Sequence, residues 1–256
     1  MSGTAPPEAG PAKLIEVQDV GKGFRVPDVR RDTVREHLLG ILNPPSYRRL
    51  EVLRAVSFDV RRGESVAIMG RNGSGKSTLL KLLCGIYVPD HGRVIVRAPL
   101  TPILELGVGW NPDLDAIDNI MLLGTVMGMS LAEVASATEE ILAFAELESF
   151  ANLELRHYSS GMASRLAYSV AFKAVREVLV LDEVYAVGDA RFKARCEERY
   201  RELKASGRTL LLVSHDERAV STCDRALLLE GGCVAASGTP EDIFNVYMEN
   251  STRPAT

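Results

Sequence analysis

The stretch from Gly70 to Thr78 constrains this chain more than any other, because it reads GRNGSGKST and fits the phosphate-binding pattern G-x-x-x-x-G-K-[ST]. Its three glycines allow backbone conformations in which successive N–H groups turn toward one anion. The apolar segment 65–69 precedes the loop, and an amphipathic segment from Ser77 to about Cys84 follows it. The pattern therefore predicts a strand, a loop and a helix whose positive N-terminal end faces a triphosphate.

Individual loop residues have separate predicted roles. Lys76 supplies a point charge to the outer phosphates, and the Ser77 hydroxyl supplies one ligand to Mg²⁺. The residues predicted to hold the nucleotide are Gly70, Asn72, Gly73, Ser74, Gly75, Lys76, Ser77 and Thr78. A chance glycine-rich turn is the alternative interpretation, and the strand and helix expected on either side of the loop argue against it.

Two carboxylates follow the apolar run 178–181. Asp182 is placed to hold Mg²⁺ directly or through water, and Glu183 to polarise a water molecule toward the γ-phosphate. An Asp-Glu pair at a strand end is common and is weak evidence by itself. It becomes strong evidence for a nucleotide site only because the chain also contains a phosphate loop. His215 follows the next apolar run and is placed to hydrogen-bond the γ-phosphate and the water, although a lone histidine there more often has a structural role.

The remaining periodicity predicts an α/β fold. Short, wholly apolar runs at 178–181 and 210–213 are typical of strands buried on both faces of a parallel sheet. Further predicted elements are strands at 14–20 and 53–60, a turn at 90–92, a helical region at about 113–175 that is clearest at 131–147, a hairpin at 227–236 turning at Gly231-Gly232, and a helix at about 240–249.

Length, charge and composition limit the classes of partner and the compartment that we expect for this chain. A chain of 256 residues is one large domain or two small ones, and its net charge of −4 argues against nucleic acid as the principal partner. No apolar run reaches the roughly eighteen residues that span a bilayer, and no leader pattern precedes a cleavage site, so we expect the chain to stay in the cytoplasm. Cysteines at 84, 196, 223 and 233 form no C-x-x-C pair and are expected to be reduced.

Three segments are predicted to lie outside the regular fold. Residues 1–13, rich in Pro, Gly, Ala and Ser, and residues 251–256 are expected to be tails. Residues 25–50 are expected to form a basic insertion with a short helix capped by Asp32. Its arginines are Arg25, Arg30, Arg31, Arg35, Arg48 and Arg49, and its shared apolar face is Val34, Leu38, Ile41 and Leu42. Such a helix suits a membrane surface or a partner protein, or else packs on its own domain.

Many protein families contain a phosphate loop, and the stretch from Tyr158 to Met162, which reads YSSGM, discriminates between them. It stands shortly before the Asp-Glu strand and resembles the signature, usually LSGGQ, of the ATP-binding-cassette ATPases. The resemblance covers the chain from Leu14 to about Glu249. It implies a cassette with a RecA-like α/β core, an antiparallel β subdomain and a helical subdomain that holds the signature. It also implies a homodimer, in which Ser159, Ser160 and Gly161 contact the γ-phosphate of the ATP on the other subunit.

The resemblance assigns four more positions. Phe24 matches the aromatic residue that stacks on adenine, Asp189 matches the aspartate that couples the two sites, and His215 matches the switch histidine. The family usually has a glutamine at the start of the helical region, but Gln18 is the only glutamine in this chain, so Glu105 is the candidate for that coupling role. Ser160 and Met162 also depart from the common signature.

These departures are together similar to one branch of the family, the ATPase subunits that export O-antigen, capsule or teichoic-acid polymers. That resemblance implies ATP and Mg²⁺ as cofactors, a separate integral-membrane permease as partner, and a lipid-linked glycan as cargo. It also implies a peripheral position at the cytoplasmic face of the inner membrane, with the insertion near that face. Some members carry a further sugar-binding domain, which we do not expect in a chain that ends at Thr256.

Several alternatives stay open. A cassette with a drug, lipid or small-solute cargo would share every motif. A soluble cassette ATPase of translation or DNA repair is disfavoured by the acidic charge and by the single cassette. A kinase or GTPase is disfavoured by the signature and by the lack of an N-K-x-D motif, and a regulator without turnover is disfavoured by Glu183.

Overall fold

The computed structural model describes residues 12–27, 47–103, 109–182 and 189–252. The helix predicted inside the insertion, most of both predicted tails, and the candidate residues Glu105 and Glu183 lie outside these ranges. The described part is an α/β structure with one antiparallel sheet, one mixed sheet and a group of helices, which confirms the predicted fold class.

A three-stranded antiparallel sheet has the order β2-β1-β4. Its strands are β1 (Lys13–Pro27), β2 (Tyr47–Arg61) and β4 (His91–Val96). The predicted strands at 14–20 and 53–60 are confirmed but are too short, because β1 and β2 pair along the full 15 residues of each. The outer parts of the predicted insertion, 25–27 and 47–50, therefore belong to strands, as does Lys13 of the predicted tail. The turn predicted at 90–92 is wrong in extent, since His91 already begins β4.

A six-stranded sheet has the order β5-β6-β7-β3-β8-β9. Neighbouring strands from β5 to β8 are parallel, and β9 runs antiparallel to β8. The strands are β5 (Leu100–Ile103), β6 (Val178–Asp182), β7 (Thr209–Val213), β3 (Ser65–Met69), β8 (Arg225–Glu230) and β9 (Cys233–Gly238). All residues of β3 and β7 are buried, as their apolar runs predict, and the predicted hairpin is β8–β9.

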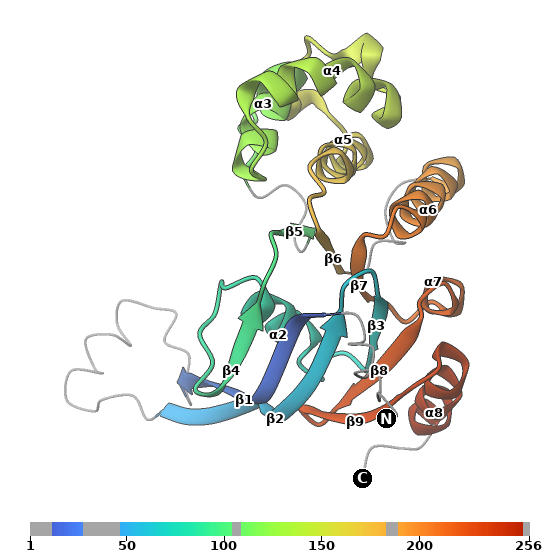
Figure 1. The fold of residues 1–256 in the computed structure, drawn as a ribbon. Helices are drawn as coiled ribbons and strands as arrows, with labels where there is room; N and C mark the ends of the chain where they lie inside the picture. Colours follow the sequence, from blue (N-terminus) through green and yellow to red (C-terminus); the bar gives the residue numbers. More distant parts are fainter. Residues whose placement is uncertain (1–11, 28–46, 104–108, 183–188, 253–256) are drawn as a thin grey trace, which may run out of the picture.

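Two hydrophobic cores lie on the two faces of this sheet, as the alternation of β3 shows. Ala67 and Met69 pack in the core that contains residues of α6 (Ala190–Ala205), α7 (Glu217–Ser221) and α8 (Pro240–Thr252). Val66 and Ile68 pack in the other core, with α2 (Lys76–Leu83), β1 and β2. Figure 1 shows the antiparallel sheet and the three helices α6 to α8 on opposite sides. The helix α8 continues past the predicted end at Glu249.

The helical region predicted at 113–175 contains α3 (Ala116–Val126), α4 (Leu131–Ala145), α5 (Ser160–Lys173) and two short 3₁₀ turns, Glu148–Phe150 and Leu155–His157. Ser130 caps α4 in a capping box with Glu133, where each side chain accepts from the other's backbone N–H. Residues of all three helices share a third core. They form the lobe at the top of Figure 1.

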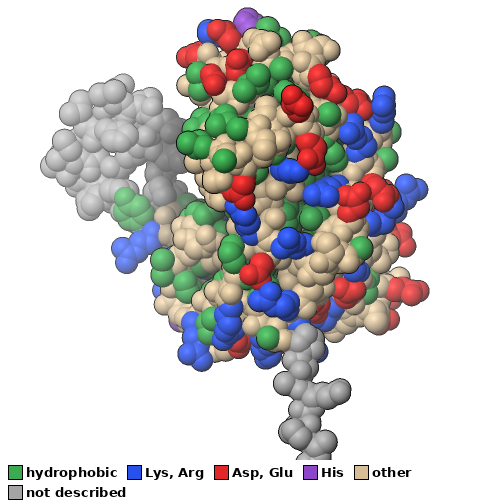
Figure 2. All heavy atoms as spheres, turned by 45° about the horizontal axis from the view of Figure 1, so that its top comes forward, with side chains coloured by type: hydrophobic (Ala, Val, Ile, Leu, Met, Phe, Trp, Pro, Cys, Tyr) green, Lys and Arg blue, Asp and Glu red, His purple; other side chains and the backbone are tan. Residues whose placement is uncertain are grey.

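The surface of the described chain is mixed in character. Figure 2 shows acidic and basic side chains interspersed, and hydrophobic side chains gathered on the helical lobe. Exposed apolar residues of that lobe include Leu122, Val126 and Leu131. None of the helices in the described ranges is long and apolar enough to cross a membrane.

Candidate nucleotide site

The loop between β3 and α2 forms as the sequence predicts, with one difference in the helix start. Gly75 is the N-cap residue of α2, which begins at Lys76 rather than at Ser77. The loop therefore ends in a helix N-terminus, where backbone N–H groups and the helix dipole favour an anion. Its exposed residues are 71–73, so an anion can approach the loop from solvent.

Lys76 is held close to the loop. The residue is 9% exposed, and its Nζ donates hydrogen bonds to the carbonyl oxygens of Gly70 at 2.7 Å and Arg71 at 3.1 Å. These contacts fold the ammonium group back over the loop instead of leaving it in solvent. A positive charge is thus fixed beside the loop, next to the carbonyl oxygens of Gly70 and Arg71.

Asp182 and Ser77 meet at the same edge of the mixed sheet. Asp182 is the last residue of β6, and Ser77 lies in the first turn of the helix that follows β3. The Ser77 hydroxyl donates a hydrogen bond to Asp182 Oδ2 at 3.1 Å. Because parallel strands carry their carboxyl ends to one edge, residues 105 positions apart in the sequence become neighbours. A hydroxyl and a carboxylate side by side are the hard oxygen donors that suit Mg²⁺.

A cavity of about 550 Å³ contains these groups. Its lining consists of Leu50, Val52, Asn72, Gly73, Gly75, Lys76, Ser77, Thr78 and Asp182. The wall contributed by β2 is apolar, and the loop supplies charge and hydrogen-bond donors. The sequence analysis did not identify Leu50 and Val52, although their position on the strand just before the loop strand was a usable signal. The arrangement suits a ligand with one apolar and one anionic part.

Phe24 does not line this cavity. It pairs across the antiparallel sheet with Leu50, which does line it, and its ring packs edge-on against Tyr87 with 5.4 Å between centroids. Lys22 Nζ lies 5.6 Å from the centroid of the Phe24 ring. The predicted adenine-stacking residue is thus on a strand that borders the site, next to a lining residue.

The signature residues lie away from the cavity within one chain. Ser159 is the N-cap of α5, where its Oγ accepts a hydrogen bond from the Met162 N–H at 3.2 Å. Ser159 and Ser160 are exposed and Gly161 is half-exposed, and none of the three lines the cavity. A single chain therefore does not bring the signature to its own phosphate loop.

Two other candidate residues lie close to helix starts: His215 beyond the carboxyl end of β7, which lies between the strands that lead to Asp182 and to the loop, and Asp189 at the start of α6. His215 is exposed and follows β7 by two positions, next to Asp216, which caps α7. Asp189 caps α6, and the Phe192 N–H donates to its carboxylate at 2.9 Å. That hydrogen bond lowers the pKa of Asp189 below its ordinary range, and the charges of Arg165 and Arg191 lower it further.

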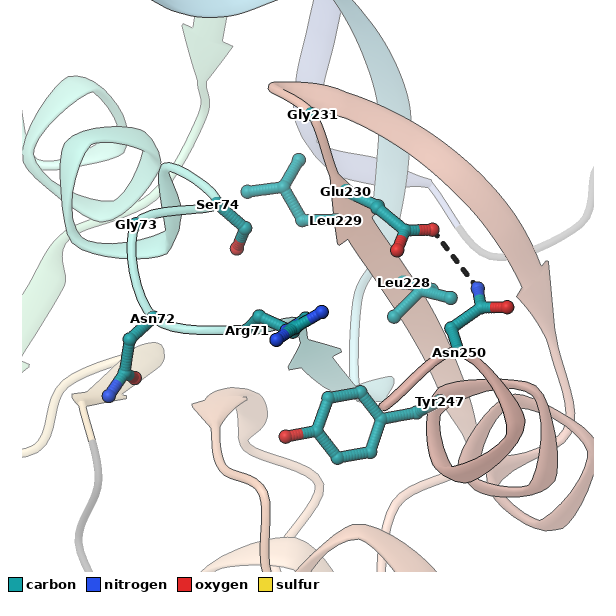
Figure 3. A pocket seen from close by; sticks show the side chains of 10 residues that line it. All are labelled: Arg71, Asn72, Gly73, Ser74, Leu228, Leu229, Glu230, Gly231, Tyr247 and Asn250. Atoms are coloured by element: carbon teal, nitrogen blue, oxygen red, sulfur yellow. Dashed lines mark hydrogen bonds between the residues drawn. The ribbon is translucent and has the colours of Figure 1, made fainter. Parts of the chain in front are cut away.

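A second cavity, of about 290 Å³, lies behind the loop (Figure 3). Residues 71–74 of the loop form one side, the end of β8 another, and Tyr247 and Asn250 of α8 the third. Ser74 Oγ is buried and has no hydrogen-bond partner among the described residues. No local pattern in the sequence predicted that the last helix would line a cavity together with the phosphate loop.

Comparison with known proteins agrees with this geometry. The family model described as "ABC transporter" matches residues 53–186, just over half of the chain. This chain belongs to the ABC transporter family. It is an ATPase cassette, the kind of domain that binds ATP in that family.

Curated relatives indicate a branch of the family. The chain is 38% identical over 242 residues to the O-antigen export system ATP-binding protein RfbB of Myxococcus xanthus, covering 92% of this chain and 55% of the relative. It is 39% identical over 203 residues to RfbB of Klebsiella pneumoniae, covering 79% and 82%. It is 32% identical over 238 residues to the teichoic acids export ATP-binding protein TagH of Listeria monocytogenes, covering 92% and 70%. The chain thus spans about half the length of the Myxococcus protein.

Solved structures share the fold. An ATP-binding subunit of an ABC transporter is 27% identical and covers 95% of each chain, with a TM-score of 0.72. A dimeric ATP-binding cassette in a post-hydrolysis state bound to ADP and Pi has the same TM-score at 22% identity, covering 89% of this chain and 99% of that one. The ABC cassette fold, with its antiparallel sheet, mixed sheet and helical lobe, is therefore shared along nearly the whole chain.

Proposed function

We propose that this ABC cassette binds and hydrolyses ATP at the interface of a homodimer and thereby drives export of a lipid-linked polysaccharide through a separate membrane permease. The observation that carries the catalytic part is the contact between Ser77 and Asp182 inside the loop cavity. Phosphoryl transfer needs a phosphate loop, a lysine and oxygen ligands for Mg²⁺ at one site, and this cavity contains all three.

In this proposal the cavity holds the nucleotide in cis. The loop N–H groups and Lys76 bind the phosphates, while Ser77 and Asp182 hold Mg²⁺, which neutralises charge on the outer phosphates. Leu50 and Val52 offer an apolar wall near the base, and Phe24 stacks on adenine after a rearrangement of its contact with Tyr87.

The remaining groups complete the site across the dimer. Glu183 polarises the attacking water, and His215 hydrogen-bonds the γ-phosphate. Ser159, Ser160 and Gly161, at the N-terminus of α5, face the γ-phosphate of the ATP held by the partner cassette. Asp189 couples the two sites. Two-fold symmetry makes the two ATP sites equal, and the separation of signature and loop within one chain supports a shared site.

The cargo is proposed from the relatives. The proteins from Myxococcus and Klebsiella are named as O-antigen exporters and the Listeria protein as a teichoic-acid exporter. An O-antigen is a polysaccharide and a teichoic acid is a polyol-phosphate polymer, so the names share a cell-surface polymer as cargo. The identity to the two O-antigen proteins is the higher, at 38% and 39% against 32%, and it favours a lipid-linked polysaccharide. The cassette would then sit at the cytoplasmic face of the membrane, bound to its permease, with Glu105 and the segment 25–50 on the side toward that partner.

The first test concerns Glu183. We expect the Glu183→Gln variant to bind ATP, to remain dimeric in ATP and Mg²⁺, and to lose nearly all hydrolysis, because the amide cannot accept a proton from water. Light scattering and phosphate release measure the two properties, and wild type is the control. Ordinary turnover by the variant would remove Glu183 from the proposed mechanism.

The second test concerns the cargo. The same variant is purified from its own membranes with ATP and Mg²⁺, and co-purifying proteins and lipids are identified by mass spectrometry. A polytopic permease together with a lipid-linked glycan supports the proposal. A permease without glycan favours another cargo, and ribosomes or DNA in place of a permease would overturn the transport assignment.

A further inference from the structure

Glu146 ends α4 at a point where three helices meet. Its carboxylate contacts three arginines: Arg165 of α5 at 3.6 Å, Arg191 of α6 at 3.2 Å and Arg195 of α6 at 3.0 Å. The Glu146 side chain is 31% exposed, and those of Arg165 and Arg195 are 19% and 34% exposed. The Arg191 side chain is 81% exposed, so the half-buried part of the network consists of Glu146, Arg165 and Arg195. Several charges that share one carboxylate restrain one another more than an isolated surface ion pair does.

Arg195 makes further contacts with the end of α4. Its Nη2 donates to the carbonyl oxygen of Ala143 at 3.3 Å, and its guanidinium carbon lies 4.8 Å from the centroid of the Phe144 ring. That ring packs edge-on against Phe172 of α5 and Phe192 of α6. The polar and aromatic contacts therefore join the same three helices, α4, α5 and α6.

The backbone at Glu146 is unusual for a glutamate. Its φ of 58° and ψ of 46° are left-handed, and Leu147 N donates to Leu142 O at 3.0 Å in the closing turn of the helix. Glycine is the usual residue at such a helix end, because a Cβ is disfavoured there. The three ion pairs that the carboxylate forms there favour a glutamate over a glycine at this position.

The network reaches two segments that the proposed dimer uses. Arg165 lies on the helix whose N-terminus carries Ser159 and Gly161, and Arg191 lies two positions after Asp189. The charges of both arginines also act on the Asp189 carboxylate. Glu146 thus connects, through one carboxylate, the helix of the signature and the helix that Asp189 caps.

We propose that Glu146 is a positioning residue that locks α5 to α6, so that the signature and Asp189 meet a partner cassette as one rigid surface. This inference rests on the proposed function, because it assigns a role in the ATP-bound dimer. Nucleotide binding in cis involves neither helix, so loss of the carboxylate should affect dimer formation and leave binding to the monomer unchanged.

The test compares Glu146→Gln with Glu140→Gln in the full-length chain. Glu140 also lies on α4 and forms an ion pair with Lys173 of α5, but it does not contact α6. Binding of a fluorescent ADP analogue measures the cis site, and ATPase rate against protein concentration measures dimer formation. We expect Glu146→Gln to weaken dimerisation about tenfold with unchanged ADP affinity, and Glu140→Gln to match wild type.

The variant Glu146→Gly separates positioning from stability. It relieves the left-handed backbone, so its thermal stability should equal or exceed that of Glu146→Gln while dimerisation stays about tenfold weak. Wild-type-like dimerisation by both Glu146 variants would overturn the inference alone. Equal losses in ADP affinity and dimerisation, together with a lower Tm, would also overturn the inference, because they would show that the substitution disturbs the structure in general. A wild-type chain without ATP-dependent dimerisation would overturn the proposed function itself.

Discussion

Gly70, the first residue of the phosphate loop, has no room for a side chain. A Cβ built there would lie less than 3.0 Å from the Leu229 carbonyl oxygen and 2.6 Å from Ser74 Oγ. Leu229 is a buried residue of β8 that pairs with Val234 of β9, so its carbonyl cannot move away easily. Gly73, in the same loop, has nothing within 4 Å of the corresponding position. The two glycines are therefore a matched pair for separating steric contact from backbone conformation.

The expected magnitudes follow from these contacts. Both residues have positive φ, 156° for Gly70 and 81° for Gly73, which costs an alanine about 1–2 kcal/mol. Overpacking adds about 1–3 kcal/mol at Gly70 only. At about 2–4 °C per kcal/mol for a chain of this size, Gly70→Ala should lower the Tm by about 6–12 °C at a loss of about 3 kcal/mol. Gly73→Ala should lower it by only about 2–4 °C at a loss of about 1 kcal/mol.

The assay is thermal unfolding followed by circular dichroism without nucleotide, with ATP affinity measured on the same samples. Affinity should also fall further in Gly70→Ala, because the Gly70 carbonyl accepts the hydrogen bond from Lys76. Equal Tm values for the two variants would refute the steric reasoning. A larger loss in Gly73→Ala would show that the loop conformation differs from the one described.

Two further predictions concern the metal pair and the helical lobe. In Ser77→Ala, loss of the hydroxyl beside Asp182 should raise the Mg²⁺ concentration for half-maximal hydrolysis about 10–100-fold, as a magnesium titration measures, and an unchanged requirement would contradict the metal role. The Ser130 N–H, donating to the Glu133 carboxylate, and Arg176 beside it hold the pKa of Glu133 at about 2, against an ordinary 4.5. Because this pKa is lowered on folding, its stabilisation is present above pH 4.5 and is lost as the pH falls toward 2. Glu133→Gln should therefore lower the free energy of unfolding at pH 7 and match wild type near pH 2 in denaturant titrations, whereas a constant difference would contradict this linkage.

Much of the fold could be predicted from local patterns. The strand of 65–69 was predicted with its observed bounds, and the α2 helix was predicted to within one residue at each end, because loop chemistry and apolar runs are properties of short segments. The helix α6 was missed. Its buried positions Phe192, Cys196, Tyr200 and Leu203 follow a helical spacing, which was a usable signal, but charged residues separate them.

The candidate site, like the fold, has parts that local sequence patterns predict and parts that they do not. The loop residues and Asp182 could be proposed as site residues from the sequence, since each belongs to a contiguous motif, and the structure brings most of them to one cavity. The contact between Ser77 and Asp182 was implied by their roles, but its length depends on the order β6-β7-β3 in the sheet. The β5 strand contains Pro102 and is only four residues long, so its pairing with β6 carried little local signal.

The sequence by itself determined the local motifs of this protein: the glycine-rich loop before α2, the carboxylate that ends β6 and the serine-rich stretch at the start of α5. Only the tertiary structure decided which distant residues share a surface. Leu50 became a wall of the loop cavity, Tyr247 came to lie behind the loop, and Glu146 met three arginines. The physical reason is that motifs are fixed by conformations within a few residues, whereas these contacts depend on how whole strands and helices pack across the chain.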